Sequence, residues 1–314
     1  MSGEPSYSVV VPVFNSSASL YELADRLDLV FSNYSNEPFE IIFVDDGSTT
    51  EQTWQSLTEL AQRYENIRAF RLSKNFGQGA ATLAGIEKAR GHWIITMDDD
   101  LQHHPEDIPC LLEYRQHDVV IARFSDKKCA YSKKLFSRLK SALDIRLLGL
   151  PKNLVSSSFK VITRRVALEI LAINTSRPFI IALVLAVTSD IVNVEVVHGE
   201  RRYGGSNYSV RRSLSLISNL LFNNSAILLR LMSIFGFALA GLSFLFGGFL
   251  VVRHLIYQST VEGWASLMVV MLLSTGVVVA CLGVLGEYVS RLIETAERRP
   301  LYTIKEERDS MGNS

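Results

Sequence analysis

Two long runs without a charged residue constrain this chain more than any other feature of its sequence. They are Leu231–Val252 and Ala265–Gly286. A helix needs about 20 residues to cross roughly 30 Å of hydrocarbon, and each run reaches that length. The alternative is a pair of core helices in a soluble domain, but such helices rarely continue so far without a charge. We therefore expect two transmembrane helices.

Positive charge lies outside the two runs rather than between them. The flanks hold Arg201, Arg202, Arg211, Arg212 and Arg230 before the first run, and Arg291, Arg298, Arg299, Lys305 and Arg308 after the second. The connector holds only Arg253. Because positive residues stay on the cytoplasmic side, both termini and the region before the first run are expected in the cytosol. The expected organisation begins with a cytosolic domain over 1–210 and a juxtamembrane amphipathic helix over 211–230. Two membrane helices follow, over 231–252 and 265–286, and a short extracytoplasmic loop over 253–264 joins them. A cytosolic tail over 287–314 ends the chain.

Overall charge and cysteine content narrow the classes of function. Lys plus Arg number 32 and Asp plus Glu number 32, so the formal net charge is zero. Bulk electrostatic attraction to nucleic acid is therefore not expected. The three cysteines lie far apart in the sequence and indicate neither a disulfide framework nor a zinc site. A reducing, cytosolic environment fits most of the chain.

The first 125 or so residues alternate between two periodicities. Apolar, β-branched runs predict strands near 9–13, 40–44, 67–72, 93–97 and 119–122, and helical spacing predicts helices near 19–33, 51–64, 78–89 and 105–115. Strands that alternate with helices favour a parallel, doubly wound sheet. The apolar segment 178–187 is half a membrane span long, so we expect a core or interfacial helix there.

Polar residues follow all five predicted strands. They are Asn15, then Asp45 and Asp46, then Lys74 and Asn75, then Asp98–Asp100, and finally Arg123. In a parallel sheet the carboxyl ends of the strands share one edge, and ligands bind there. The pattern predicts a site of nucleotide size at this edge.

The acidic run at the end of the fourth strand carries the strongest chemical signal. Crowded carboxylates repel one another unless a cation joins them, and oxygen ligands suit Mg²⁺ or Mn²⁺. In extended geometry Asp98 and Asp100 project to one side, so we expect these two, with Gln102 as an accessory, to bind the metal. Two alternatives remain: a solvated acidic turn before Pro105, or a zinc or iron site that uses His103 and His104.

Two further loops have open interpretations. Asp45 and Asp46 could form a turn that starts the next helix, or Asn15 and Asp45 could accept hydrogen bonds from the imide and ribose of a uridine. The glycine-rich segment 75–79 opens a helix and could hold phosphate. It lacks the spacing of a P-loop, and no Gly-x-Gly-x-x-Gly follows the first strand, so neither nucleotide motif applies.

Together these segments resemble glycosyltransferase family 2. The motifs are Ser8–Asn15, Val44–Ser48, Lys74–Gln78 and Asp98–Glu106, in that order, and Leu285–Arg291 resembles the membrane tail of the polyprenyl-phosphate subgroup. That subgroup includes dolichol-phosphate mannose synthases, bactoprenol glucosyltransferases and undecaprenyl-phosphate aminoarabinose transferases. The resemblance extends from Tyr7 to about Tyr302.

The resemblance implies a GT-A domain, a Rossmann-like fold with a mostly parallel sheet, followed by the two membrane helices. It implies a UDP- or GDP-linked sugar bound by Pro12, Asn15, Asp45, Asp46, Lys74, Asn75, Gln78, Asp98 and Asp99, and Mg²⁺ or Mn²⁺ bound by Asp98, Asp100 and Gln102. The acceptor would be polyprenyl (undecaprenyl) phosphate, bound by Arg123, Lys133, Arg138, Arg202 and Ser206. The catalytic set would be Asp98, Asp100, Arg123 and Arg202, because guanidinium groups suit phosphate oxygens.

Some positions depart from the family or have a second interpretation. Relatives carry Asp-x-Gly near Ser156–Ser158 and Lys at Asn207. A sugar hydroxyl acceptor would need a carboxylate base there, whereas a phosphate acceptor is already charged and needs orienting cations.

Arg138 and Lys133 lie on a predicted amphipathic helix over 131–148 and could bind either the lipid phosphate or the bilayer surface.

The sequence thus predicts an inverting, metal-dependent enzyme of the hexosyltransferase type (EC 2.4). It would move one sugar to undecaprenyl phosphate at the bacterial inner membrane, for a cell-envelope glycan or lipopolysaccharide modification. A homotetramer is expected by analogy. The sequence does not identify which sugar is transferred. One alternative is a transferase that extends a lipid-linked oligosaccharide, and another is a catalytically weak membrane scaffold that retains the nucleotide fold.

Overall fold

The computed structural model describes residues 4–35, 37–124, 154–175, 178–196, 263–296 and 300–309, together with single helical positions between 238 and 256. The chain divides into two compact units. One comprises Met1–Asn207 with Arg299–Ser314, and the other comprises Tyr208–Arg298. The first contains the sheet and its helices, and the second contains the long helix near the C-terminus.

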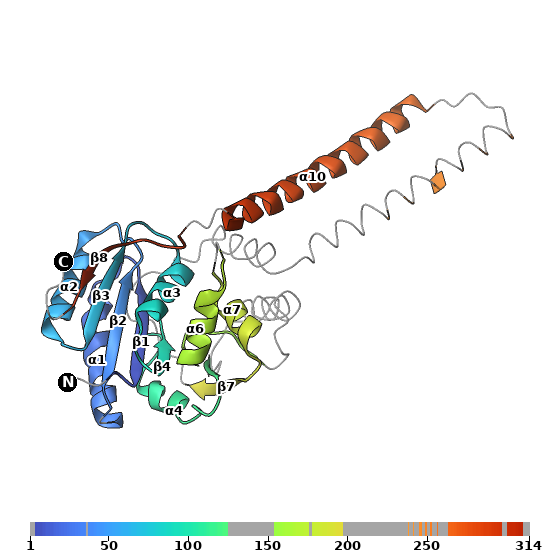
Figure 1. Ribbon diagram of the computed structural model, residues 1–314. Helices are drawn as coiled ribbons and strands as arrows, with labels where there is room; N and C mark the ends of the chain where they lie inside the picture. The colour runs from blue at the N-terminus through green and yellow to red at the C-terminus, as the bar shows by residue number, and fades with distance from the viewer. Residues whose placement is uncertain are drawn as a thin grey trace. The chain divides into compact units, whose positions relative to one another are not determined.

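An eight-stranded sheet forms the centre of the first unit (Figure 1). Its strands are β1 (Tyr7–Val13), β2 (Phe39–Asp45), β3 (Ile67–Leu72), β4 (Trp93–Thr96), β5 (Val119–Phe124), β6 (Lys160–Thr163), β7 (Ile191–Val196) and β8 (Ile304–Arg308). Their spatial order is β7-β5-β6-β4-β1-β2-β3-β8. The pairs β1–β2, β1–β4, β2–β3 and β5–β7 are parallel, and β4–β6, β5–β6 and β3–β8 are antiparallel.

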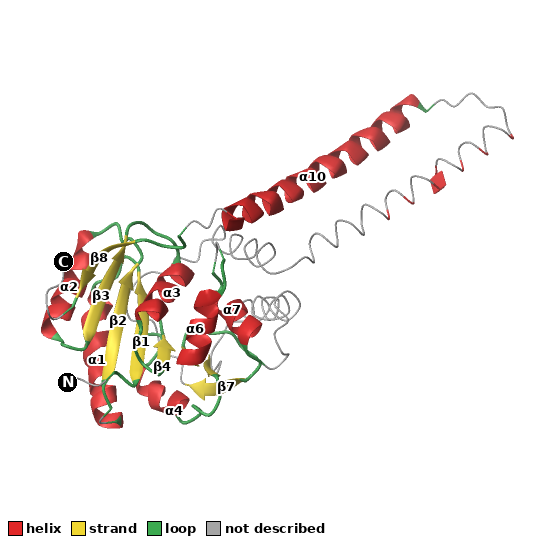
Figure 2. Ribbon diagram, in the orientation of Figure 1, coloured by secondary structure: helices red, strands yellow, loops and turns green. Residues whose placement is uncertain are grey.

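Helices cover both faces of the sheet (Figure 2). On one face lie α1 (Ala18–Tyr34), α2 (Glu51–Arg63) and α4 (Ile108–Leu112), the last preceded by a 3₁₀ turn, η1 (Pro105–Asp107). On the other face lie α3 (Gln78–Lys88), α6 (Arg164–Ala172) and α7 (Ile180–Val187). Because helices cover both faces of the sheet, every residue of β1 is buried, which explains the continuous apolar run Val9–Val13.

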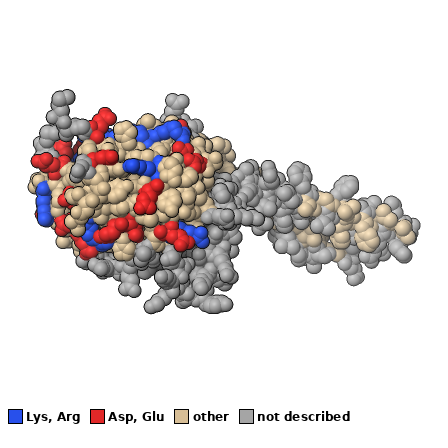
Figure 3. Space-filling model, turned by 90° about the horizontal axis from the view of Figure 1, so that it is seen from below, with Lys and Arg blue, Asp and Glu red and all other residues tan. Residues whose placement is uncertain are grey.

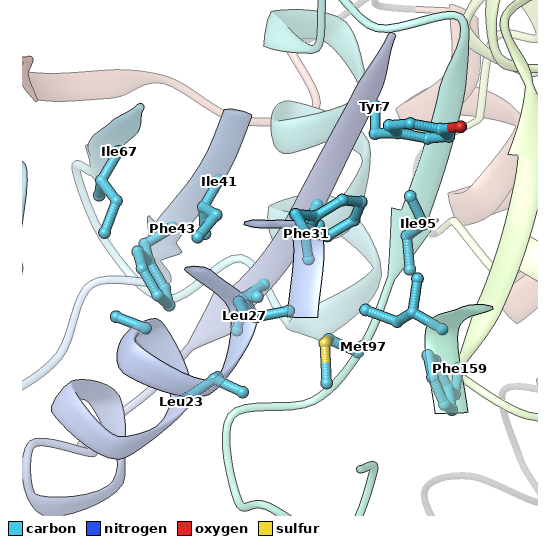
Figure 4. Close-up of a cluster of buried hydrophobic side chains, with 14 of the residues drawn as sticks. Tyr7, Leu23, Leu27, Phe31, Ile41, Phe43, Ile67, Ile95, Met97 and Phe159 are labelled. Atoms are coloured by element: carbon cyan, nitrogen blue, oxygen red, sulfur yellow. The ribbon is translucent and has the colours of Figure 1, made fainter. Parts of the chain in front are cut away.

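The core beneath α1 and α2 is rich in aromatic rings (Figure 4). Phe31 of α1 stacks on Phe39 with ring centroids 4.6 Å apart, and Tyr7 of β1 lies 5.5 Å from Phe31. Phe43 of β2 is fully buried in the same cluster. Burial of each such side chain contributes about 1.5–3 kcal/mol, so this packing fixes the strands whose ends carry the polar residues.

The C-terminal segment contains a long helix and the last strand of the sheet. Helix α10 (Trp264–Ala296) is 33 residues long and includes the second predicted membrane helix. After it the chain returns to the first unit, where β8 pairs antiparallel with β3 and brings Glu307 opposite Phe70. Among the described residues, the structure contains no helix with both the length and the apolar character needed to cross a membrane.

The expected alternation of strands and helices is confirmed up to β5, with boundaries shifted by a few residues. The mostly parallel sheet is confirmed, and the antiparallel pairs are those that β6 makes with β4 and β5 and that β8 makes with β3. Within the segment 178–187, residues Ile180–Val187 form α7, whose buried Ile181 and Val184 make it a core helix. The predicted helices over 131–148 and 211–230 lie outside the described residues, and only single positions of the predicted span 231–252 are described.

Candidate functional site

The polar residues predicted to meet do lie at one edge of the sheet. Strands β1 to β4 run parallel in their own group, and β5 runs in the same direction as β4 because both pair antiparallel with β6. Their carboxyl ends therefore share one edge. In open α/β sheets this edge is where ligands bind.

Asp98 follows β4 and is held by two side-chain donors. Gln78 Nε2, at the start of α3, donates to Asp98 Oδ1 at 2.7 Å. Ser158 Oγ, just before β6, donates to Asp98 Oδ2 at 2.8 Å. The Thr96 hydroxyl donates to the Ser158 carbonyl at 2.6 Å, which anchors the second donor to β4. The carboxylate is thus oriented before any ligand binds.

The turn after Asp98 has an unusual backbone. Leu101 has φ of 60°, in the left-handed region that non-glycine residues rarely adopt. Its side chain is nevertheless buried, and Gln102 N–H donates to Asp100 Oδ1 at 3.1 Å. Strain of this kind costs about 1–3 kcal/mol and persists where the surroundings enforce it, commonly at functional sites. Burial of the Leu101 side chain and the Asp100 turn together enforce this conformation.

The carboxyl group of Asp99 is poorly compensated. Asp99 Oδ2 is enclosed and has no hydrogen-bond partner among the residues that the structure describes. Burial, together with the nearby charges of Asp98 and Asp100, raises the pKa of Asp99 to about 6, and a hydrogen bond from Ser16 opposes the rise. This stretch of three carboxylates therefore carries negative charge that the described side chains neutralise only in part.

The donor chemistry here fits the predicted metal. Asp98, Asp100 and Gln102 offer carboxylate and amide oxygens, which are the ligands that Mg²⁺ and Mn²⁺ prefer. Over the described part of the chain there is no group of three or more His, Cys, Asp or Glu side chains that could hold an ion. The predicted set has two carboxylates and one amide, so these residues would supply only part of the oxygen ligands that either ion takes.

The two histidines of this loop have other partners. The His103 ring is 5% exposed and stacks between Phe124 and Phe159, with centroids 5.3 and 5.2 Å away. Its Nδ1 accepts a hydrogen bond from Asp98 N–H at 3.0 Å. His104 Nδ1 lies 3.0 Å from Arg26 Nη2. His103 is a core residue that closes the turn, and the structure gives no support to the zinc or iron alternative.

The loop after β2 is tied to the loop before α3 by Asp46. Its two carboxylate oxygens accept from Phe76 N–H at 2.7 Å and Gly77 N–H at 2.9 Å. Burial raises the pKa of Asp46 to about 6 even though these donors oppose the shift. Gly47 has φ of 65°, and a Cβ there would lie 2.4 Å from the Lys74 carbonyl carbon. Only glycine allows the two loops to approach so closely.

Asp45 forms the turn that was the alternative interpretation of this motif. Ser48 N–H donates to Asp45 Oδ1 at 2.9 Å, the pattern of an Asx turn. Asp45 is fully buried, and its Oδ2 lies 3.4 Å from Arg71 Nε. Burial raises the pKa of Asp45, and Ser48 and Arg71 oppose that shift. In this structure both acidic residues therefore have internal partners.

Arg71 of β3 connects the site to the C-terminal strand. Its guanidinium pairs with Glu51 at 2.8 Å and with Glu306 of β8 at 3.3 Å, besides facing Asp45. Glu306 also accepts from Trp54 Nε1 at 3.0 Å. The pairing holds β8 to the edge of the sheet beside β3.

Asn15, directly after β1, has φ of 55° and links the first two loops. Its side-chain oxygen accepts from the Thr49 N–H at 2.9 Å and hydroxyl at 3.1 Å, and its own N–H donates to Ser48 Oγ. The oxygen that was expected to accept from a uridine is thus already used. The Asn15 amide nitrogen remains for a ligand.

The other predicted site residues fall into three groups. Pro12 is buried in β1, and Lys74, Asn75 and Arg123 are exposed at the rim. Lys74 Nζ lies 5.1 Å from the Phe76 ring centroid. The remaining predicted residues, Lys133, Arg138, Arg202 and Ser206, with Asn207, lie outside the described residues. Charges of both signs are intermingled on the face of the first unit that Figure 3 shows.

Two residues of the site were not identified from the sequence. Arg71 and Lys160 both face acidic residues of the rim. Lys160 has one signal, a basic residue directly before an apolar run, and Arg71 has a weaker one because β3 also contains Arg68. Ser158 lies in the serine run that the sequence singled out, but its hydrogen bond to Asp98 was not expected.

Comparison with known proteins gives consistent matches over most of the chain. The model of the family described as "Glycosyl transferase family 2" matches residues 8–171. An undecaprenyl-phosphate 4-deoxy-4-formamido-L-arabinose transferase of Klebsiella pneumoniae is 33% identical, over 95% of this chain and 92% of that protein. The protein of the same name in Pseudomonas fluorescens is 34% identical, over 95% and 89%. An uncharacterized glycosyltransferase of Bacillus subtilis, YkcC, is 32% identical over 97% and 95%.

A solved structure with a similar fold is glucosyl-3-phosphoglycerate synthase from Mycobacterium tuberculosis, in complex with Mn²⁺, UDP and glucosyl-3-phosphoglycerate. Its TM-score is 0.51 at 16% identity, and the match covers 70% of this chain and 77% of that one. At this level of identity the match shows the GT-A-like fold alone.

Proposed function

Because this chain belongs to glycosyltransferase family 2, we propose that it transfers one sugar from a UDP- or GDP-linked donor to polyprenyl phosphate. The single observation that carries the proposal is the rim at which Asp98, Asp99 and Asp100 meet the loops after β1 and β2. The names of the full-length relatives support the acceptor, since they are undecaprenyl-phosphate transferases.

The donor would bind across this rim. Asp98 is oriented by Gln78 and Ser158, and Asp100 and Gln102 adjoin it in the strained turn. Mg²⁺ or Mn²⁺ held by Asp98, Asp100 and Gln102 would neutralise the charge of the departing diphosphate. The exposed Lys74 and Asn75 and the Asn15 amide nitrogen would contact the nucleotide. Arg123 at the end of β5 would contact phosphate.

The acceptor proposal has a chemical basis in the loop before β6. Ser156–Ser158 stand there, and Ser158 is committed to Asp98. No described carboxylate of that loop could remove a proton from a sugar hydroxyl. A phosphate monoester carries about 1.5 to 2 negative charges at neutral pH and needs no such base. A polyprenyl phosphate is therefore the acceptor that this loop favours.

We also propose that the chain is anchored in the bacterial inner membrane, with the catalytic unit and both termini in the cytosol. The uncharged runs 231–252 and 265–286 support this. Leu267, Met271 and Leu282 of α10 are exposed, and so are Leu285 and Leu292. Apolar side chains along one helix need a covering, which lipid or neighbouring copies of the helix would supply.

The test is a transfer assay with the purified full-length chain. It would be incubated in detergent with Mn²⁺, undecaprenyl phosphate and a panel of labelled UDP- and GDP-sugars. We expect one donor to give label in the organic phase, and Asp100→Ala to abolish it. Glu113→Gln, an exposed carboxylate at the end of α4, is the matched control and should keep full activity. Label in an oligosaccharide fraction would instead favour an extending transferase, and absence of product with every donor would refute the proposal.

A further inference from the structure

A buried lysine lies next to the acidic turn, and nothing in the sequence motifs accounts for it. Lys160 begins β6, where it pairs with Thr96 of β4 on one side and Ile121 of β5 on the other. Its side chain is enclosed, with 4% of the residue exposed. No side-chain hydrogen bond and no ion pair within 4 Å joins Lys160 to a described residue. A charged side chain that is largely buried without an ion pair is unfavourable, so this residue needs an explanation.

The register of the antiparallel pair places Lys160 close to Asp98. Lys160 lies opposite Thr96, which is two residues before Asp98 in the chain. Ser158, two residues before Lys160 and just outside β6, donates to Asp98 Oδ2 at 2.8 Å. Lys160 therefore lies one step further from the rim than the contact between Ser158 and Asp98. Burial lowers the pKa of Lys160 to about 8, and the charge of Asp98 opposes that shift. At pH 7 the side chain still carries its charge most of the time.

The position of this charge has opposite effects on the two species that the proposed function would bring to the rim. A divalent cation at Asp98 is repelled by the ammonium of Lys160. A nucleoside diphosphate is an anion and is attracted by it. The cation–diphosphate pair is close to neutral or anionic, so it avoids most of the repulsion that a lone cation meets.

We propose that Lys160 is a positioning residue that acts as the internal counter-ion of Asp98. It keeps the carboxylate compensated in the empty site and makes the site select a divalent cation together with a diphosphate over the cation alone. This inference rests on the proposed function, because it assumes that a cation and a diphosphate meet at Asp98. It concerns the order in which ligands bind.

The test measures binding and needs no turnover. Titration calorimetry would give the affinity of the full-length chain for MnCl₂ alone, and then for UDP and GDP with Mn²⁺ present. In Lys160→Met we expect Mn²⁺ alone to bind at least about tenfold more tightly than in the wild type, because a like charge that interacts with Asp98 is removed. The affinity for UDP or GDP in the presence of Mn²⁺ should rise by a smaller factor than the affinity for Mn²⁺ alone, or should fall. Lys160→Arg should behave as the wild type does.

Two controls separate this outcome from damage to the fold. Lys88→Met removes an ammonium from the far end of α3 and should leave Mn²⁺ affinity unchanged. Lys160→Gln provides a second neutral variant, and a gain of affinity in either neutral variant cannot arise from misfolding. If Mn²⁺ alone binds equally or more weakly in both neutral variants, the inference is wrong and the proposed function stands. If the wild type binds neither diphosphate even with Mn²⁺, the proposed function itself fails, and the inference with it.

Discussion

Gly85 determines how closely α3 can approach the sheet. It lies in the middle of α3, and a Cβ built there would be 2.3 Å from Val10 Cγ1 of β1 and 3.2 Å from Val44 Cγ2 of β2. Normal carbon contacts are about 3.5–4.0 Å, so Gly85→Ala would push the helix outward by roughly an ångström. Gln78, at the other end of α3, would then move away from Asp98. Gly85→Ala should therefore change both the free energy of unfolding and the affinity of the site for a nucleotide.

The magnitude follows from two opposing terms. Overpacking costs about 1–3 kcal/mol, and replacing a helical glycine by alanine returns up to about 1 kcal/mol. We expect Gly85→Ala to lose roughly 0–2 kcal/mol of unfolding free energy. Val10→Ala alone should lose about 2 kcal/mol, because Val10 is fully buried. In the double variant the new methyl group fills the space that Val10 vacates, so the losses should not add. The expected coupling is at least about 1 kcal/mol.

Urea unfolding of all four proteins, followed by tryptophan fluorescence in one detergent, measures this coupling. Trp54 and Trp93 both belong to the sheet unit and report on its unfolding. The single Gly85→Ala variant should also bind UDP–Mn²⁺ more weakly, and the double variant should recover part of that affinity. Losses that add to within about 0.5 kcal/mol would refute the contact between α3 and β1 as described here.

Two further predictions concern buried charge. Asp99→Asn should stabilise the protein by up to about 3 kcal/mol above pH 6, because burial raises the pKa of the wild-type carboxyl to about 6 and so disfavours its ionised form in the folded state; the gain should shrink as the pH falls below 6 and vanish near about pH 3, below the unfolded-state pKa, where the group is protonated in both states, and thermal unfolding across this range would show the dependence. Arg71→Met should cost about 3 kcal/mol in urea unfolding, since it leaves buried Asp45 without its nearby cation. Glu51→Gln, which removes only the exposed partner of Arg71, should cost no more than about 1 kcal/mol, and equal losses in these two variants would contradict the assignment.

Much of the sheet could be predicted because its strands are buried on both faces. Runs such as Ile41–Val44 of β2 are continuous and apolar, which marks a strand between two helical layers. The polar residues after these strands then fall at one edge by the direction of the chain alone. The carboxylates after β4 and the loop after β2 were found in this way.

The antiparallel additions could not be predicted in the same way. β6 is four residues long and begins with a lysine, so its apolar run is too short to distinguish from a loop. β8 reads Ile-Lys-Glu-Glu-Arg and has no apolar face that would mark a strand. Its pairing with β3 depends on residues more than 200 positions away, such as the contact between Glu306 and Arg71. Local sequence does not contain that information.

The internal partners of the acidic residues also lay beyond sequence reasoning. Asp45 and Asp46 could be assigned either to a nucleotide or to a turn, and the structure shows that Ser48 uses one oxygen of Asp45 while Phe76 and Gly77 use both oxygens of Asp46. Which carboxylates remain available depends on the approach of separate loops, and only the assembled structure reveals it. The burial of Lys160 opposite Thr96, close to the contact between Ser158 and Asp98, likewise depends on the pairing of β6 with β4.

The central claim is that the rim after β4 holds a divalent cation together with a nucleoside diphosphate. Titration calorimetry of the purified full-length chain with UDP and GDP, with and without Mn²⁺, tests it most directly. We expect one of the two nucleotides to bind only when Mn²⁺ is present, and the binding to disappear in Asp100→Ala. Nucleotide affinity that is unchanged by Mn²⁺, or that survives intact in Asp100→Ala, would contradict the account.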